Sequence, residues 1–185
     1  LADAETFVWV DLCGPTPAEL QQVADELGLH ELAVEDALEP HQRPKLDHYA
    51  EHLFLSCRTA ELDVEHGQLT EHEIDAFIGD RWLITVRMDP GWSMEAVEAR
   101  WDRSPELAIH GVSFLLYGLI DVVVDGYFET VQDFDEYYDT VSDGIFADEP
   151  LAPSQQRSWF EVRRALVRFH RLVVPMREAV SALMR

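Results

Sequence analysis

The sequence has few cysteines, few basic residues and no long apolar segment. Its two cysteines, Cys13 and Cys57, lie far apart and form no Cys-x-x-Cys pattern, which excludes a disulfide framework and a cysteine-rich zinc site. The longest apolar stretch, residues 112–120, ends at Asp121 and is far shorter than the roughly 20 residues of a membrane-spanning helix. With 185 residues, of which 47% are hydrophobic, the chain is long enough for one globular domain or for one domain with an appendage.

Basic side chains are scarce and unevenly placed. The chain has 14 basic and 36 acidic residues, a net charge of −22, and Lys45 is its single lysine. This acidity excludes a general binder of nucleic acid or of anionic membrane surfaces, and it favours cations, basic partners or a high-salt environment. Seven arginines but only two glutamates lie within residues 154–185. We therefore expect this basic segment to pack against the acidic body, within the chain or between chains.

The first half has the patterns of mixed α and β structure. Helices are expected from Thr16, Pro17 and Glu19, which form a start signal, to Gly28, and over about 31–38 and 93–103. Strands are expected at residues 7–12, 52–57, 73–78 and 82–86, the last two joined as a hairpin at Gly79. The sequence therefore predicts an α+β fold.

The second half has only helical patterns. One long helix is expected from about residue 113, and a second after a proline-rich break at 148–154. Pro175 should kink this second helix or remove one hydrogen bond. Its apolar residues form a heptad seam: Trp159, Val162, Leu166, Phe169, Val173, Met176, Val180 and Leu183. We expect an antiparallel helical hairpin over 111–185, following a first region over 1–110. The seam could face the other long helix or other subunits.

Two groups of carboxylates are candidates for cation binding. Asp121, Asp125, Glu129 and Asp133 recur every four residues, and Asp121 lies among apolar neighbours, where a carboxylate needs a cation or a hydrogen-bond partner. Glu35 and Asp36 are adjacent, with no Lys or Arg close by in the sequence. Hard divalent ions such as Mg²⁺ and Ca²⁺ prefer oxygen ligands. The alternative for each group is a solvated acidic surface, which a salt-adapted source would also produce.

One motif points to a different chemistry. The segment from His48 to His52, with Glu51 between them, matches the H-x-x-E-H signature of a group of zinc hydrolases. That chemistry needs a helix that places both histidines on one face. Pro44 lies just upstream and a strand begins at His52, so the helix would have almost no length. We interpret the match as coincidence and do not expect an enzyme.

Several blocks of the sequence can be compared with known families. The most specific is the Glu-Asp pair within residues 34–38, followed by His-Gln-Arg-Pro-Lys at 41–45. Further blocks are residues 7–12, 15–20, 29–30, 46, 49, 116–121, 124–127 and 174–178. In their order and spacing these blocks resemble the CorA family of magnesium transporters, over nearly the whole chain. The membrane helices and the Gly-Met-Asn signature of that family are missing.

The resemblance implies a fold, an assembly and a site. It implies an α/β/α sandwich over 1–110, followed by long antiparallel helices over 111–185 that include the start of a stalk helix. It also implies a homopentamer in the full-length protein, attached to the membrane only through the missing C-terminal helices. The chain would then be a soluble fragment at the cytoplasmic face of the inner membrane, which binds no nucleic acid.

The resemblance also assigns a regulatory role to particular carboxylates. Glu35, Asp36 and Asp121 match the family's regulatory divalent-ion positions, which lie between neighbouring subunits. A further carboxylate from the neighbour's stalk helix would fall beyond Arg185. The expected function is to sense intracellular Mg²⁺ and gate the pore. A Co²⁺ or Zn²⁺ transporter of the same superfamily is an alternative, as are a zinc hydrolase and a free-standing helical interaction module.

Overall fold

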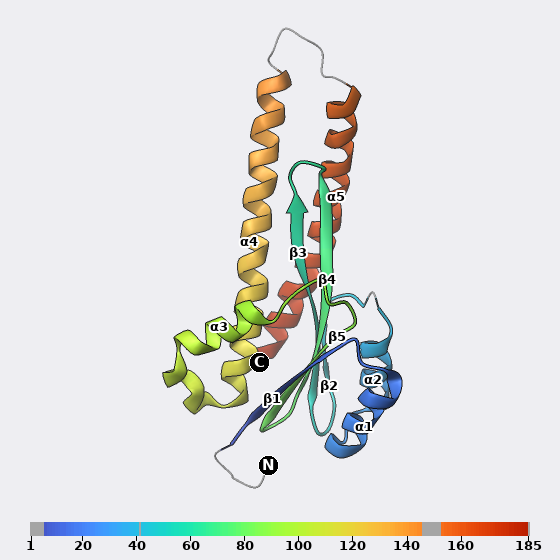
Figure 1. Ribbon diagram of the computed structural model, residues 1–185, viewed down its shortest axis with the longest axis vertical. Helices are drawn as coiled ribbons and strands as arrows, with labels where there is room; N and C mark the ends of the chain where they lie inside the picture. Colours follow the sequence, from blue (N-terminus) through green and yellow to red (C-terminus); the bar gives the residue numbers. More distant parts are fainter. Residues whose placement is uncertain (1–5, 41, 146–152, 185) are drawn as a thin grey trace.

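The computed structural model describes residues 6–40, 42–145 and 153–184, and it has a five-stranded mixed sheet flanked by helices (Figure 1). The α+β class predicted from the sequence is confirmed. In chain order the elements are β1 (Val8–Cys13), α1 (Pro17–Leu27), α2 (Glu31–Leu38), β2 (Lys45–His48), β3 (Leu53–Asp63), β4 (Gln68–Ile78), β5 (Trp82–Arg87), α3 (Glu95–Arg103), the 3-10 helix η1 (Pro105–His110), α4 (Val112–Ile145) and α5 (Pro153–Leu183).

The strand order of the sheet is β1-β5-β4-β3-β2. β1 runs parallel to β5, and the other pairs are antiparallel. The hairpin expected at Gly79 is confirmed, and the Gly79 N–H donates to the Trp82 carbonyl at 2.9 Å. β2 was not expected, and β3 and β4 extend well beyond the predicted 52–57 and 73–78. The extensions are rich in charged residues, which obscure the apolar alternation of a strand.

Helices cover both faces of this sheet (Figure 1). α1 and α2 cover one face, where Leu20 and Ala33 pack against Phe54 and Phe77 of the strands. The start of α1 is the predicted capping box, in which the Thr16 hydroxyl accepts from the Glu19 N–H and the Glu19 carboxylate accepts from the Thr16 N–H. The long helices contribute to the core on the opposite face, together with strand residues that alternate with those of the first cluster.

The two long helices run antiparallel, and β3 and β4 rise between them (Figure 1). They touch directly through aromatic pairs such as Phe134 and Phe169, whose ring centroids are 5.7 Å apart. α5 also packs on β2, β3 and β4, so this is not a simple helix pair. Pro175 lies inside α5, which continues to Leu183. Among the described residues, no helix is both long enough and apolar enough to cross a lipid bilayer.

The seam predicted on α5 is correct at only part of its positions. Leu166 is 38% exposed, and Val173 and Val180 are only partly buried. Because α5 also packs against β2, β3 and β4, its buried face differs from the predicted seam and includes small residues. The buried stripe consists of Val162, Ala165, Phe169, Leu172, Met176 and Ala179.

Gly118 lets α3 lie close against α4. A Cβ atom at Gly118 would lie 2.3 Å from Nε1 of Trp101, which is far inside van der Waals contact. The same indole N–H donates to the Leu115 carbonyl at 3.1 Å. The absence of a side chain at Gly118 therefore fixes the position of α3, which carries Arg100 next to Trp101 in the sequence.

We predict that Gly118→Ala destabilises the protein although alanine is the better helix former. The added methyl must displace the Trp101 ring, and overpacking of this kind typically costs about 1–3 kcal/mol. Gly126→Ala on the same helix is the matched control. Nothing lies within 4 Å of a Cβ there, so this variant should gain about 0.5–1 kcal/mol of stability. Urea unfolding of both variants measures the difference, and equal stabilisation by both would contradict this account of α3 docking.

Candidate metal site and charged pocket

Glu35 and Asp36 lie on α2, a short helix that begins after His30. The His30 ring accepts from the Leu32 N–H at 3.2 Å and caps the helix. This helix exposes Glu35, whereas Asp36 is partly buried at the sheet. The two neighbouring carboxylates therefore have different surroundings, and only Asp36 is held by the fold.

Glu35 and Asp36 have no Lys or Arg close by in the sequence, but the fold brings a basic side chain to Asp36. Lys45, on β2, places its Nζ atom 2.5 Å from Asp36 and 3.0 Å from Asp47. Burial lowers the pKa of Lys45, but the two carboxylates outweigh burial and raise it above its usual value. The loop between α2 and β2 reverses the chain direction, so a residue nine positions further along the sequence returns to the helix. Proximity in the sequence did not reveal this contact.

Asp121 lies on α4 and also has a basic partner. Arg100 of α3 forms ion pairs with Asp121 and with Asp125, one turn further along α4. The side chain of Asp121 is 24% exposed. The expectation that a carboxylate among apolar neighbours needs a cation or hydrogen-bond partner is thus confirmed. The partner is Arg100 of α3, the helix that packs closely against α4 at Gly118.

The structure does not bring Asp36 and Asp121 together within one chain. α2 packs on one face of the sheet and α4 on the other (Figure 1). The described residues include no group of three or more His, Cys, Asp or Glu side chains that could hold a metal ion. Carboxylate oxygens suit Mg²⁺, but the candidate ligands of one chain form two separate groups, each with a basic side chain already in contact.

The H-x-x-E-H segment has no helix and does not form a zinc site. His48 ends β2, and the turn that follows leads into β3. The His52 ring is buried: its Nε2 accepts from the His30 N–H at 3.0 Å, and its Nδ1 donates to the Leu53 carbonyl at 3.1 Å. Because both nitrogens of His52 are engaged and the histidines do not share a helix face, the structure gives no support to the zinc-hydrolase hypothesis.

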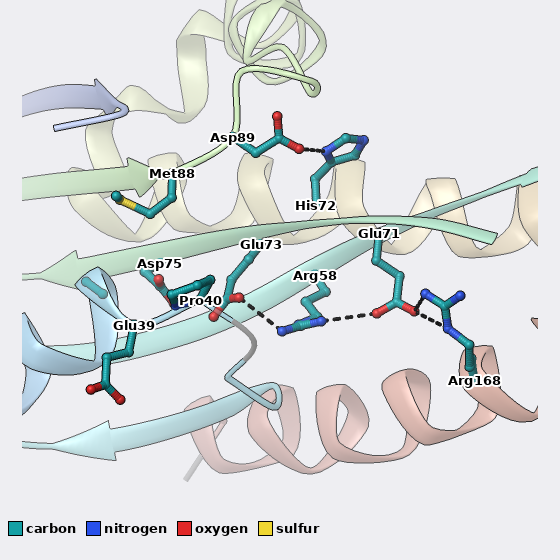
Figure 2. A pocket seen from close by; sticks show the side chains of 11 residues that line it. Glu39, Pro40, Arg58, Glu71, His72, Glu73, Asp75, Met88, Asp89 and Arg168 are labelled. Carbon is teal, nitrogen blue, oxygen red and sulfur yellow. Dashed lines mark hydrogen bonds and ion pairs between the residues drawn. The ribbon is translucent and has the colours of Figure 1, made fainter.

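A network of ion pairs that the sequence did not reveal lies beyond the end of α2 (Figure 2). Arg58 of β3 binds Glu71 at 3.1 Å and Glu73 at 3.0 Å, both on β4. Gln42 joins this group, because its N–H donates to Glu73 and its carbonyl accepts from Arg58. On the other side, Arg168 of α5 donates to Glu71 at 2.8 Å. The expected packing of the basic segment on the acidic body thus occurs within the chain at Arg168.

This network borders a cavity of about 260 Å³. Its wall combines apolar side chains with an excess of carboxylates: Ala37, Glu39, Pro40, Arg58, Glu71, His72, Glu73, Asp75, Met88, Asp89 and Arg168 (Figure 2). A signal in the sequence was available, because Glu71, Glu73 and Asp75 recur at every second position. In a strand this spacing places all three on one face.

Asp75 is the most deeply buried carboxyl of this wall, at 3% exposure. Burial raises the pKa of Asp75 to about 8. The negative charges of Glu73 and Asp36 act in the same direction, whereas the Ser56 hydroxyl and Arg58 oppose the shift. Ser56 lies opposite Asp75 in the strand register, yet neither its Oγ nor Oδ1 of Asp75 has a well-formed hydrogen bond among the described residues.

Comparisons with known proteins decide the family. A family model described as CorA-like Mg²⁺ transporter protein matches residues 4–185. The chain belongs to the CorA family. The resemblance found in the sequence is thereby confirmed, and most of its matched blocks lie in β1, α1, α2, α4 and α5 or in the segment that leads from α2 into β2.

Relatives and solved structures of this CorA family are similar to the chain over most of its length. It is 27% identical over 172 residues to a putative metal ion transporter, YfjQ, of Bacillus subtilis, and 26% identical over 186 residues to the cobalt/magnesium transport protein CorA of Thermotoga maritima. These matches cover 93% and 99% of the chain but 52% of each relative, so the chain spans about half the length of those relatives.

The solved structures support the same fold. The soluble domain of CorA from Methanocaldococcus jannaschii superposes with a TM-score of 0.76 at 17% identity, covering 97% of this chain and 70% of that one. The cytoplasmic domain of ZntB from Vibrio parahaemolyticus gives a TM-score of 0.63 at 16% identity, covering 99% of this chain and 72% of that one. At these identities the likeness concerns the fold alone.

We predict that Asp75→Asn removes a pH dependence of stability. The folded-state pKa of Asp75 is raised, so the folded protein binds a proton that the unfolded chain releases, and stability falls as the pH rises towards about 8. Between pH 6.5 and 8.5 the wild type should lose roughly 2 kcal/mol of unfolding free energy relative to Asp75→Asn. Urea unfolding across this range measures the difference. Parallel pH profiles of the two proteins would contradict the burial of a titrating Asp75.

Proposed function

We propose that this chain is the cytoplasmic regulatory domain of a CorA-family divalent-cation transporter, and that Mg²⁺ regulates it through Asp36, Glu35 and Asp121. The single observation that supports this most directly is the placement of Asp36 and Asp121. By the resemblance, both carboxylates stand at the family's regulatory positions; both are partly buried, and the helices that carry them pack on opposite faces of the sheet. In a ring of identical subunits, two different surfaces of each chain meet across every contact, so two carboxylates that are apart in one chain can approach between neighbours.

The basic partners of these carboxylates determine the net charge of each site when no divalent cation is bound. Lys45 is shared between Asp36 and Asp47, and Arg100 between Asp121 and Asp125. Each site therefore keeps one more negative charge than positive charge. Facing half-sites from two subunits repel each other through this excess, and a divalent cation between them would remove the repulsion.

Gating follows from the difference in cation affinity between the two assembly states. Mg²⁺ supplies the double positive charge that the half-sites lack, and it favours the state in which carboxylates of neighbouring subunits approach. A ligand shifts such an equilibrium only by its differential affinity for the two states. With a homopentamer in the full-length protein, closure of the pore at high internal Mg²⁺ would give negative feedback on influx at the cytoplasmic face of the membrane.

The identity of the transported ion is part of the proposal. Carboxylates at the candidate positions favour Mg²⁺, which takes oxygen ligands and keeps several of its waters. Co²⁺ is an alternative because the Thermotoga relative is a cobalt/magnesium transport protein. A Zn²⁺ transporter has weaker support, since it rests on the fold likeness to ZntB.

The test is a titration of protease resistance with Mg²⁺ in the full-length transporter. Asp36→Asn combined with Asp121→Asn should move the midpoint of protection to a Mg²⁺ concentration about tenfold higher or more, because each half-site loses a charged ligand. Lys45→Gln should act in the opposite direction and lower the midpoint a few-fold, roughly, because Asp36 loses its competing cation. These opposite signs distinguish a charged site from general destabilisation.

Asp133→Asn is the matched control for this titration. Asp133 lies on α4, further along the same acidic stripe as Asp121, and it is not one of the matched family positions. Its protection midpoint should equal that of the wild type. If the double variant is protected at the wild-type Mg²⁺ concentration, Asp36 and Asp121 are part of an acidic surface and the sensing role is wrong.

A further inference from the structure

Several of the scarce basic side chains of this chain line one hollow on its surface. The hollow has a volume of about 360 Å³ and lies between the loop after α2, strands β3 and β4, and helix α5. Four arginines line it: Arg43, Arg58, Arg168 and Arg171. Glu71 is the only carboxylate among the described residues of its wall. This arginine hollow is therefore a positive patch on a chain whose net charge is −22.

Two of the four arginines are engaged by the fold and two are not. Arg58 binds two carboxylates of β4, one of which, Glu71, also accepts from Arg168 at 2.8 Å (Figure 2). Arg43 and Arg171 are exposed, and neither forms an ion pair with any described residue. Four guanidinium groups thus face two carboxylates, and the arginine hollow keeps an excess of two positive charges that a bound anion would neutralise.

The fold holds the two unpaired arginines in place at their backbones. The Gln42 carbonyl accepts from Nε of Arg58 at 2.8 Å, and Pro44 is buried, so the chain is anchored on both sides of Arg43. Arg171 lies in α5, a helix that packs on the sheet. Groups that are already positioned lose less conformational entropy when a ligand binds.

The arrangement of the arginines indicates which anion fits. A guanidinium fork binds phosphate and carboxylate groups through paired N–H bonds. The four forks come from a loop, a strand and a helix, so they approach the arginine hollow from different directions. A phosphate presents its oxygens in tetrahedral directions, whereas a carboxylate presents two oxygens in one plane and suits a single fork. The volume of the hollow exceeds that of one phosphate group and accommodates two.

We propose that the arginine hollow binds a diphosphate group, either free or as part of a nucleotide, and that Arg43 and Arg171 donate to its oxygens. Arg58 and Arg168 add positive charge from the wall. This proposal goes beyond the regulatory Mg²⁺ function and does not depend on it. The acidic surface elsewhere does not prevent binding of a small anion, because charges more than about 8 Å away are largely screened at physiological salt. A nucleic acid, in contrast, would also lie across that acidic surface.

Isothermal titration calorimetry of this chain with inorganic pyrophosphate tests the proposal. The measurement is made at neutral pH, without divalent metal ions and at about 0.15 M salt, so that distant charges are screened. We expect saturable binding of one pyrophosphate per chain. Arg43→Gln and Arg171→Gln should each weaken binding by about tenfold or more, because each removes a charged donor pair. ATP distinguishes the two sources: tighter binding than pyrophosphate assigns a nucleotide, and weaker binding assigns free diphosphate.

Two controls separate this site from diffuse charge effects. Arg163→Gln makes the same charge change at an exposed position of α5 outside the arginine hollow, and it should leave the affinity unchanged. Citrate carries a similar negative charge on carboxylates alone, and it should bind about tenfold more weakly or less.

The proposal is overturned by any of four results: no saturable binding of pyrophosphate, an unchanged affinity in both Arg43→Gln and Arg171→Gln, an equal loss in Arg163→Gln, or citrate binding as tight as that of pyrophosphate. Both substituted arginines are exposed, so we expect the variants to fold. If one of them does not fold, an unchanged affinity in the other is the contradicting result.

Discussion

Basic side chains are much scarcer than acidic side chains in this chain, and this imbalance determines how its carboxylates are paired. Lys45, Arg58 and Arg100 lie on three different elements, and each one bridges two carboxylates. Lys45 and Arg100 each neutralise half of the charge that they hold, so these two groups keep a net negative charge, whereas Arg168 adds a second positive charge to the Arg58 group. Removing Lys45 or Arg100 would leave the partly buried carboxylate of Asp36 or Asp121 uncompensated, which is more unfavourable than losing an exposed ion pair.

The sheet determines how these positions relate to one another. α2 with Asp36 packs on one face, and α4 with Asp121 packs on the other, so no movement of side chains within one chain can join them. The Arg58 network adds a connection between distant elements, because it links Arg168 of α5 through Glu71 and Glu73 to the loop after α2. A change in the position of α5 would therefore act on the segment that leads to Lys45.

Local signals in the sequence predicted those parts of the fold that local physics controls. The capping box at Thr16 and Glu19 and the hairpin at Gly79 depend on a few consecutive residues, and both are confirmed. The end positions of β3 and β4 were missed because their charged residues hide the alternation. On α5 the alanines at 165 and 179 carry little hydrophobic signal, yet they are buried because the strands approach closely there.

At the candidate sites, too, the sequence predicted local features but not contacts between distant elements. Asp121 was singled out by its apolar neighbours, and its need for a partner could be inferred from them. The partners themselves, Arg100 and Lys45, could not be inferred, because their contacts depend on how α3 and β2 pack. Asp75 was overlooked because an acidic residue within a strand pattern gives no sign of burial unless the neighbouring strand and helix are known.

Cysteine cross-linking in the full-length transporter tests the central claim most directly. The protein would carry Asp36→Cys and Asp121→Cys in a Cys13→Ser background, since Cys13 is exposed whereas Cys57 is buried. A short bismaleimide should join the thiol introduced at position 36 of one subunit to the thiol introduced at position 121 of the next. The double variant should then give a ladder of linked subunits on a denaturing gel, which neither single variant gives. Absence of linked subunits from the double variant would contradict the claim that Asp36 and Asp121 meet across a subunit contact.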